Sequence, residues 1–264
     1  MGKVIPFSGL PDYLARLRRT SSQSIQATIL DTNVLITSAY EVRDEHGEVA
    51  KMLDTLVSNE YRLLATVNTK AEFLEFQRRL LLTENLLDAV DEHSKLKVPK
   101  AARAKILSLK GTLSSTVASD PERDFVFNDP QLKKIKQELS AGDHSGQNGW
   151  LELCDLFLAG RIQAAETELM GRGIEYVSQH EPSQKEIFDA KIDWPDAILL
   201  SEKTGASFSD SMILNAFRCS RCPFIVSQDF DVGYAVLADP KMKDAVMPDR
   251  LAAEYRHYHF EKQG

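Results

Sequence analysis

Short apolar segments alternate with amphipathic ones near the start of the sequence, and this alternation constrains the fold more than any other feature. The run from Ser24 to Ile36 predicts a buried strand that ends at or near Asp31, and Tyr61–Val67 predicts a second strand. Residues 46–60 between them predict a helix, and Thr69 is expected to open another. One face of the first helix should carry Val49, Met52, Leu53, Leu56 and Val57. Strand–helix–strand–helix at this spacing is typical of a parallel α/β sheet.

The pattern changes in the middle of the chain and then returns. Residues 85–171 predict helices joined by polar loops, whereas residues 173–179 and 222–230 again predict strands. A helix over residues 184–205 is expected to be broken at Trp194-Pro195. We therefore expect a core formed by residues 25–84 and 172–264, a mainly helical insertion at 85–171, and an N-terminal extension at 1–24.

Composition and charge exclude several classes of protein. With 43% hydrophobic and 27% charged residues, the chain is expected to fold around a sizeable core. No apolar run approaches the ~20 residues that span a bilayer, and the first residues lack the apolar part of a signal peptide, so a cytoplasmic protein is expected. A net charge of −7 excludes nucleic-acid binding through bulk charge, although not through a local basic face. Cys219 and Cys222 lack two further ligands at zinc spacing and are interpreted as packing residues near a helix end.

Four carboxylates occupy comparable places in the predicted elements. Asp31 and Asp229 come at the ends of strands, and Glu72 and Asp210 fall in the first turns of helices. Because strand carboxyl ends and the following helix starts share one edge of a parallel sheet, these side chains are expected to converge. Converging carboxylates repel one another, and a divalent cation with oxygen ligands relieves the repulsion. Hydrolysis of a phosphodiester is the chemistry that such a site favours.

Each acid also has a purely structural interpretation. Thr69-x-x-Glu72 fits a capping box, and Asp210 fits the acid-rich first turn of a solvated helix. Asp229 fits turn chemistry, and Asp31 fits a buried carboxylate satisfied by hydrogen bonds. The metal hypothesis is preferred because four independent structural reasons would have to coincide at one sheet edge. The neighbouring polar residues expected to orient the carboxylates are Thr32, Asn33, Ser227 and Asp231.

Four stretches together resemble the PIN-domain superfamily, most closely its VapC-like ribonuclease branch. They are DTNVL (31–35), ATVNTKAEF (65–73), GASFSDSMILNA (205–216) and IVSQDFD (225–231). Matched motif by motif, the family's four acids fall on Asp31, Glu72, Asp210 and Asp229. Asp231 competes with Asp229 for the last role, and Ser227 stands in a place usually held by threonine.

The resemblance implies a three-layer α/β/α sandwich with a central parallel sheet, interrupted here by the helical insertion. It implies a metal-dependent endoribonuclease that uses Mg²⁺ or Mn²⁺ to hydrolyse RNA. A toxin–antitoxin role, with a cognate antitoxin or another protein partner and a homo-oligomeric state, is implied in the same way. The main alternative is a catalytically inactive PIN-like scaffold that binds RNA or protein. A haloacid-dehalogenase-like phosphatase is disfavoured because position 33 is Asn, and no Gly-rich dinucleotide motif follows a strand.

RNA is a polyanion, so basic groups must flank an acidic site. The segment Lys95–Lys110 contains six basic residues and no acid, and Lys133–Lys136 is a second cluster. Arg218 and Arg221 follow the predicted helix of Asp210 and are further candidates. The residues predicted to bind RNA are Arg78, Arg79, Lys97, Lys100, Arg103 and Lys105. The structural alternative for this basic run is a solvated helix face.

Overall fold

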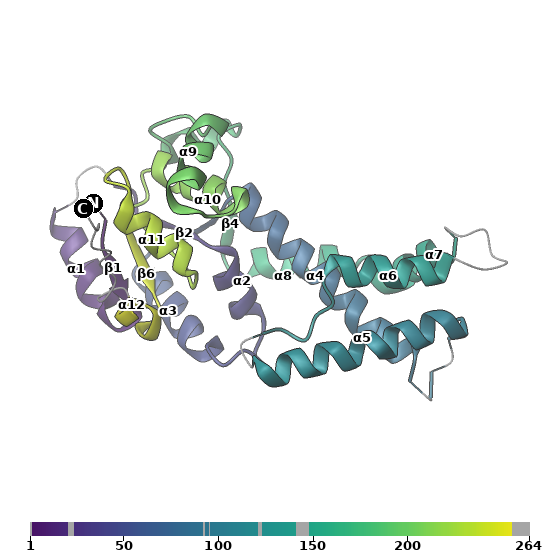
Figure 1. Cartoon of the computed structure of the whole chain (residues 1–264). Coiled ribbons are helices and arrows are strands. Elements are labelled where there is room, and N and C mark those ends of the chain that lie inside the picture. Colours follow the sequence, from purple (N-terminus) through teal and green to yellow (C-terminus); the bar gives the residue numbers. More distant parts are fainter. Residues whose placement is uncertain are drawn as a thin grey trace, which may run out of the picture. The chain divides into compact units, whose positions relative to one another are not determined.

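The computed structural model describes residues 2–20, 24–91, 93–94, 96–120, 123–140 and 148–254. The chain divides into two compact units, which we call unit 1 (Met1–Phe73 and Leu169–Gly264) and unit 2 (Leu74–Glu168). Unit 1 contains a six-stranded sheet in which every pairing is parallel (Figure 1). The predicted α/β class is therefore confirmed.

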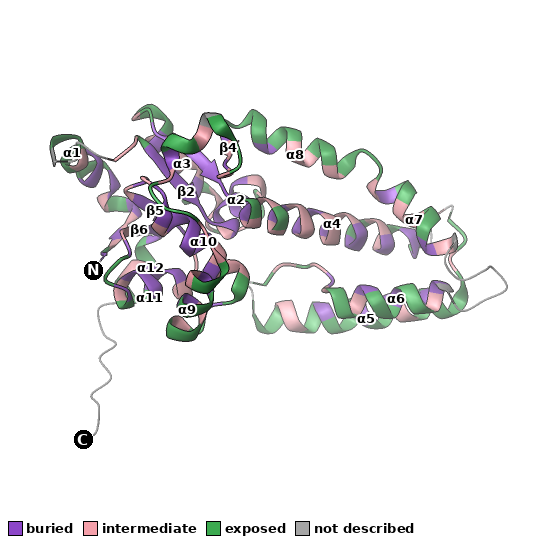
Figure 2. Ribbon diagram, turned by 90° about the horizontal axis from the view of Figure 1, so that it is seen from above, coloured by how far each residue is buried: buried purple, intermediate pink, exposed green. Residues whose placement is uncertain are grey.

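The strands of unit 1 are short, and their order in the sheet is β1-β6-β5-β2-β3-β4. They span Val4–Pro6 (β1), Ala27–Leu30 (β2), Arg62–Ala65 (β3), Ile174–Tyr176 (β4), Phe224–Val226 (β5) and Asp244–Met247 (β6). All residues of the central strands β2 and β5 are buried, as expected for parallel strands covered on both faces (Figure 2). The hydroxyl of Thr28 in β2 donates to the Phe224 carbonyl at 2.9 Å, which satisfies a polar group in this core.

Helices cover both faces of the sheet, which gives the expected three layers. The chain moves in opposite directions across the sheet from β2 to β3 and from β5 to β6, so right-handed crossovers place their helices on opposite faces. One layer contains α1 (Leu10–Thr20) and α3 (His46–Ser58), and the other contains α9 (Trp194–Thr204), α10 (Phe208–Cys219) and α11 (Phe230–Ala238). Unit 1 also contains α2 (Thr32–Ala39), α12 (Asp249–Glu254) and the 3-10 turns Phe7–Gly9 and Pro182–Ile187.

The sheet has a topological switch point between β2 and β5. From β2 the chain proceeds outward to β3 and β4, and it then returns to the other side of β2 to form β5 and β6. In open parallel sheets, ligands bind outside the strand carboxyl ends at such a reversal. Asp31 directly follows β2, and Ser227 directly follows β5, so both residues lie at this point.

The described part of unit 2 contains helices joined by loops and no strand, as predicted for the insertion. It comprises most of α4 (Val67–Ala89), α5 (Lys100–Ser119), α6 (Asp129–Ser140) and α7 (Asn148–Leu158), with α8 (Arg161–Gly171) leading back to unit 1. Its core contains Leu86, Ile106, Phe127, Ile135 and Trp150. Its bounds are residues 74 and 168, compared with the predicted 85 and 171.

Several local predictions differ from the structure. Residues 4–20 are not an extension outside the core, because β1 pairs with β6 and α1 covers the sheet. The first strand ends beside Asp31 as predicted, and the apolar residues after it form helix α2, which was not predicted. The helix expected over 184–205 is confirmed only from Trp194: residues 188–193 are not helical, and α9 begins at Trp194 with Pro195 in its first turn, where its missing N–H costs nothing.

Two further details differ within helices. Val57 is 55% exposed and Leu53 is only partly buried, whereas Val49, Met52 and Leu56 form the buried face of α3 as expected. Lys95, the first residue of the predicted basic segment, lies outside the described part of the chain.

In the parts of the chain that the structure describes, none of the helices combines the length and the apolar character that a membrane crossing requires.

Candidate active site

Asp31 is a buried carboxylate with two hydrogen-bond donors. It follows β2, where its backbone N–H donates to the Val226 carbonyl of β5 at 2.9 Å, and it forms the N-cap of α2. Its Oδ1 accepts from the Thr32 N–H at 2.7 Å, and its Oδ2 accepts from Ser227 Oγ at 2.7 Å. The residue is only 3% exposed. The strand thus ends in a carboxylate that is fixed in orientation but surrounded by protein.

Ser227 connects Asp31 to Asp229. Its side chain is completely buried, and its Oγ accepts from the Asp229 N–H at 2.9 Å while donating to Asp31. Asp229 in turn is the N-cap of α11, and its Oδ1 accepts from the Asp231 N–H at 2.8 Å. The main chain of Asp231, and not its carboxylate, therefore supports Asp229.

Glu72 reaches the same edge from α4. Thr32 Oγ1 donates a short hydrogen bond to Glu72 Oε2. The capping-box interpretation of Thr69 and Glu72 is wrong, because Thr66 occupies the capping place: its Oγ1 accepts from the Thr69 N–H at 3.2 Å. Glu72 is thereby available to the site.

Asp210 lies in the first turn of α10 and is held by Ser207. The Asp210 N–H donates to Ser207 Oγ at 3.2 Å, and Ser207 Oγ is 2.6 Å from Asp210 Oδ2. Asp210 thus lies in the first turn of a helix, as its structural interpretation anticipated, and it also contacts the N-cap residue. It also acts electrostatically on the buried acids of the switch point.

Burial and mutual repulsion raise the pKa values of two of the acids. The pKa of Asp31 rises to about 7, mainly because burial disfavours its charge, with smaller contributions from the negative charges of Asp229 and Asp210. The hydrogen bonds from Ser227 and Thr32 act in the opposite direction. The pKa of Asp229 is also raised, first by burial and then by the charges of Asp210, Asp231 and Glu72, against the Asp231 N–H bond. The four predicted acids therefore share one electrostatic environment.

Neutral groups, and not cations, hold these carboxylates. Among the described residues, none of the four acids forms a salt bridge with Lys, Arg or His. Other acids of unit 1 are paired with cations: Glu175 with Arg62 at 2.7 Å, and Asp239 with Arg218 at 3.5 Å. The negative charge of the site is consequently oriented without being neutralised.

The donor set fits a hard divalent cation in its chemistry, although not as a preformed cage. Within the described ranges, no three His, Cys, Asp or Glu side chains are close enough together to hold an ion as they stand. Mg²⁺ usually keeps several waters and takes one or two carboxylates directly, so three direct protein ligands are not required. Asp31 and Asp229 are the best placed for that role, because Ser227 Oγ binds both the Asp31 carboxylate and the Asp229 N–H.

Two other residues at this edge were not singled out by the sequence. Gln228 lies between Ser227 and Asp229, and its Nε2 donates a short hydrogen bond to Glu45 Oε2. Its Oε1 is buried and has no partner among the described residues. No sequence pattern links Glu45 to Gln228, since they lie 183 positions apart. Of the remaining predicted residues, Asn33 is partly buried in the first turn of α2.

The predicted basic residues fall into two groups in unit 2. Arg78 pairs with Glu75 at 2.5 Å and with Asp129 at 2.6 Å, and Arg79 lies 3.9 Å from Glu75. Lys97, Lys100 and Arg103 are exposed, and Lys105 is partly exposed. In unit 1, Arg218 and Arg221 have acidic partners too, Arg218 with Asp196 and Asp239, and Arg221 with Asp189.

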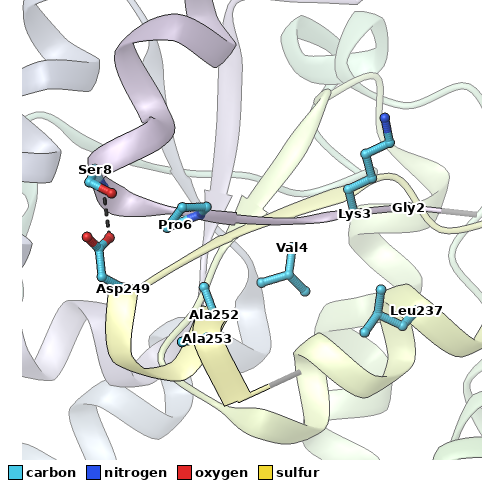
Figure 3. Close-up of a pocket in the computed structure, with 9 residues that line it drawn as sticks. All are labelled: Gly2, Lys3, Val4, Pro6, Ser8, Leu237, Asp249, Ala252 and Ala253. Atoms are coloured by element: carbon cyan, nitrogen blue, oxygen red, sulfur yellow. Dashed lines mark hydrogen bonds between the residues drawn. The ribbon is translucent and has the colours of Figure 1, made fainter. Parts of the chain in front are cut away.

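A pocket of about 400 Å³ lies elsewhere in unit 1, beside β1, α11 and α12 (Figure 3). Its lining is formed by Gly2, Lys3, Val4, Pro6, Ser8, Leu237, Asp249, Ala252 and Ala253, none of them a predicted site residue. The Ser8 N–H donates to Asp249 Oδ1 at 2.8 Å, so the one carboxylate among these lining residues already accepts a hydrogen bond from the protein. Small and apolar groups dominate the rest, so the pocket offers little for catalysis.

The cysteines are free thiols, and Cys219 and Cys222 are buried. Burial raises the pKa of Cys222 to about 11 and also raises that of Cys219, so neither is a reactive thiolate. Their interpretation as packing residues fits this environment.

No family model matches the chain, and no curated protein or solved structure matches it.

Proposed function

We propose that this protein is a metal-dependent endoribonuclease of the PIN-domain type, with Asp31, Glu72, Asp210 and Asp229 as its acidic site. The observation that carries the proposal is the Asp31–Ser227–Asp229 connection at the sheet's switch point. It holds the Asp31 carboxylate and the Asp229 main chain together where open α/β sheets bind ligands, and both carboxylates are without a cationic partner among the described residues. The four motifs quoted from the sequence support the same conclusion.

Asp31 and Asp229 would hold Mg²⁺ or Mn²⁺, with Glu72 and Asp210 facing the same ion or its waters. When bound, the metal would supply an activated water and would stabilise negative charge on a phosphoryl oxygen. The other groups orient these ligands. Ser227 sets the rotamer of Asp31, and the Thr32 hydroxyl holds the Glu72 carboxylate.

Cleavage of a labelled RNA in Mn²⁺, in Mg²⁺ and in excess chelator tests the proposal. We expect metal-dependent cleavage, with a loss of at least about 100-fold in Asp31→Asn and in Asp229→Asn, because each removes a charged ligand. Asp54→Asn, on the exposed side of α3, is the matched control and should cleave like the wild type. Equal cleavage by Asp31→Asn and the wild type would refute the assignment.

A non-catalytic PIN-like scaffold is the second candidate, and one observation favours it. As the side chains stand, no three potential ligands within the described ranges are close enough to share an ion. This candidate predicts no cleavage in either metal and no change in the stability of the protein when Mn²⁺ is added. Cleavage and Mn²⁺-dependent stability, measured on the same protein preparations, distinguish the ribonuclease from the non-catalytic scaffold.

The resemblance is also the basis for proposing a protein partner, such as a cognate antitoxin, and a homo-oligomeric state. The three free thiols fit the reducing compartment expected of a cytoplasmic protein. Size-exclusion chromatography with light scattering measures the oligomeric state, and co-purification of a small partner from the native host tests the antitoxin proposal.

A further inference from the structure

Unit 2 contains a long stretch without acidic residues. No Asp or Glu occurs from His93 to Ser119, although a segment of this length would carry about four at the chain's average acid content. The same stretch contains six basic residues in a chain whose net charge is −7. Five of the six are described by the structure: Lys97, Lys100, Arg103, Lys105 and Lys110.

Helix α5 turns these cations outward. Its apolar residues Ala102, Ile106, Leu109 and Leu113 are buried in the core of unit 2. Lys100, Arg103 and Lys110 are exposed and lie within about 80° of one another around the helix axis, outside the buried stripe, and much of the helix surface is open to solvent (Figure 2). At 1.5 Å per residue, Lys100 and Lys110 are about 15 Å apart along the helix axis, a length comparable to a few nucleotides of an extended strand.

The charge on this surface is not neutralised within the protein. Throughout the described ranges, none of the five cations forms a salt bridge, whereas Arg78 is paired with both Glu75 and Asp129. Only cations that lack internal partners offer a polyanion its full gain from counterion release. The cations without internal partners are therefore those of α5 and the residues just before it, rather than the two arginines of α4.

The composition of the surface favours nucleic acid over a protein partner. Protein interfaces place aromatic and other large apolar groups at their centre and are depleted in lysine. All residues of α5 are described, and Leu107, at 46% exposure, is its one exposed large apolar side chain. Lys100, Arg103 and Lys110 surround it with charge.

We infer that the exposed face of α5, formed by Lys100, Arg103 and Lys110 with Lys97 just before the helix, binds the phosphates of an RNA strand. The inference rests on the proposed ribonuclease function, which makes RNA the relevant polyanion. On this proposal, unit 2 contributes affinity for RNA, and unit 1 contains the acidic residues that would cleave it. Because both belong to one chain, RNA held by unit 2 has a raised effective concentration at the acidic site.

Fluorescence anisotropy with a labelled single-stranded RNA of about 20 nucleotides tests the inference. Asp31→Asn in chelator serves as the background, so that cleavage does not interfere. The variant carries Lys100→Glu, Arg103→Glu and Lys110→Glu together. Its control carries Lys51→Glu, Lys185→Glu and Lys241→Glu, three exposed lysines of unit 1 that give the same change in net charge.

We expect the α5 variant to bind at least about tenfold more weakly than the background, and its salt dependence to lose about two units of slope, since three phosphate contacts are removed. The control should bind like the background. Equal weakening in both variants would indicate bulk charge alone and would overturn the inference, as would undiminished RNA binding by the α5 variant. Preferential binding of an acidic protein over RNA would also overturn it.

Cleavage assays separate this inference from the proposed function. In the wild-type background, the α5 variant should show a raised KM for RNA with kcat unchanged. If the protein binds RNA through α5 but does not cleave it, the RNA-binding surface is supported and the proposed nuclease function is refuted. If the α5 variant cleaves RNA with wild-type kinetics, the nuclease function is supported and the α5 surface is refuted. Circular dichroism checks that the variants fold, and the corresponding glutamine substitutions should give intermediate affinities.

Discussion

Asp31→Asn is expected to stabilise the metal-free protein at neutral and alkaline pH. Asparagine has nearly the shape of aspartate. Its Oδ1 can accept from the Thr32 N–H, and its Nδ2 can donate to Ser227 Oγ, so both contacts of the buried carboxylate have a replacement. What disappears is the charge, which burial and the neighbouring acids disfavour. The substitution would thus remove the proposed metal ligand and increase stability.

The magnitude follows from the pKa of Asp31, which rises from 3.8 to about 7 on folding. Between these pH values the folded state binds a proton that the unfolded state has lost, so this group's contribution to stability falls as pH rises from about 4 to about 7. A pKa shift of this size corresponds to about 4 kcal/mol in the free energy of unfolding. Asp31→Asn should therefore gain up to about 4 kcal/mol at pH 8 and almost nothing at pH 4.

Hydrogen exchange of the β2 and β5 amides measures this effect in unit 1 alone, which matters because the chain has two compact units. Wild type and variant are compared at the same pH, so their intrinsic exchange rates cancel. Adding Mn²⁺ at 100 times its Kd should stabilise the wild type by about 2.7 kcal/mol and leave the variant unchanged. A gain that is equal at pH 4 and pH 8, or shared by Asp54→Asn, would refute the reasoning.

Three further substitutions test the supports of the site. Ser227→Ala removes the donor to Asp31, and its cleavage rate should fall about tenfold or more, in line with a lost bond to a charged group; wild-type rates would contradict that role. Ser207→Ala removes the cap of α10 beside Asp210 and should cost about 1 kcal/mol in thermal unfolding. Gly205→Ala places a side chain at φ 77° and should cost about 1–2 kcal/mol, with cleavage unchanged at low temperature. An effect of Gly205→Ala on kcat would show that the turn does more than end α9.

The central strands and their terminal acids could be predicted because their physics is local. Strands buried on both faces appear as continuous apolar runs, so β2 and β5 are visible in the sequence. A carboxylate at the end of such a run is costly unless it has partners, which made Asp31 conspicuous. Parallel topology then places the strand ends together without any further information.

The missed features depend on contacts that no local pattern encodes. Helix α2 is buried almost throughout, and an apolar segment without a polar face is indistinguishable from a strand. Strand β1 has three residues and pairs with β6, about 240 positions away. Thr66 and Thr69 are both plausible caps, and only the structure shows which accepts the N–H. The pairing of Arg78 with Asp129 likewise joins distant segments.

The kind of partner that holds each acid distinguishes a structural carboxylate from one kept for a ligand. Glu175 and Asp239 are matched by arginines, which orient a carboxylate and neutralise it at once. Asp31 is oriented instead by a hydroxyl and a main-chain N–H, and its raised pKa shows that these donors do not balance its burial. Orienting Asp31 with a hydroxyl therefore leaves its buried charge unbalanced, which lowers the stability of the metal-free protein. A purely structural carboxylate gives no reason for such an arrangement, and a divalent ion is the partner that would balance the charge.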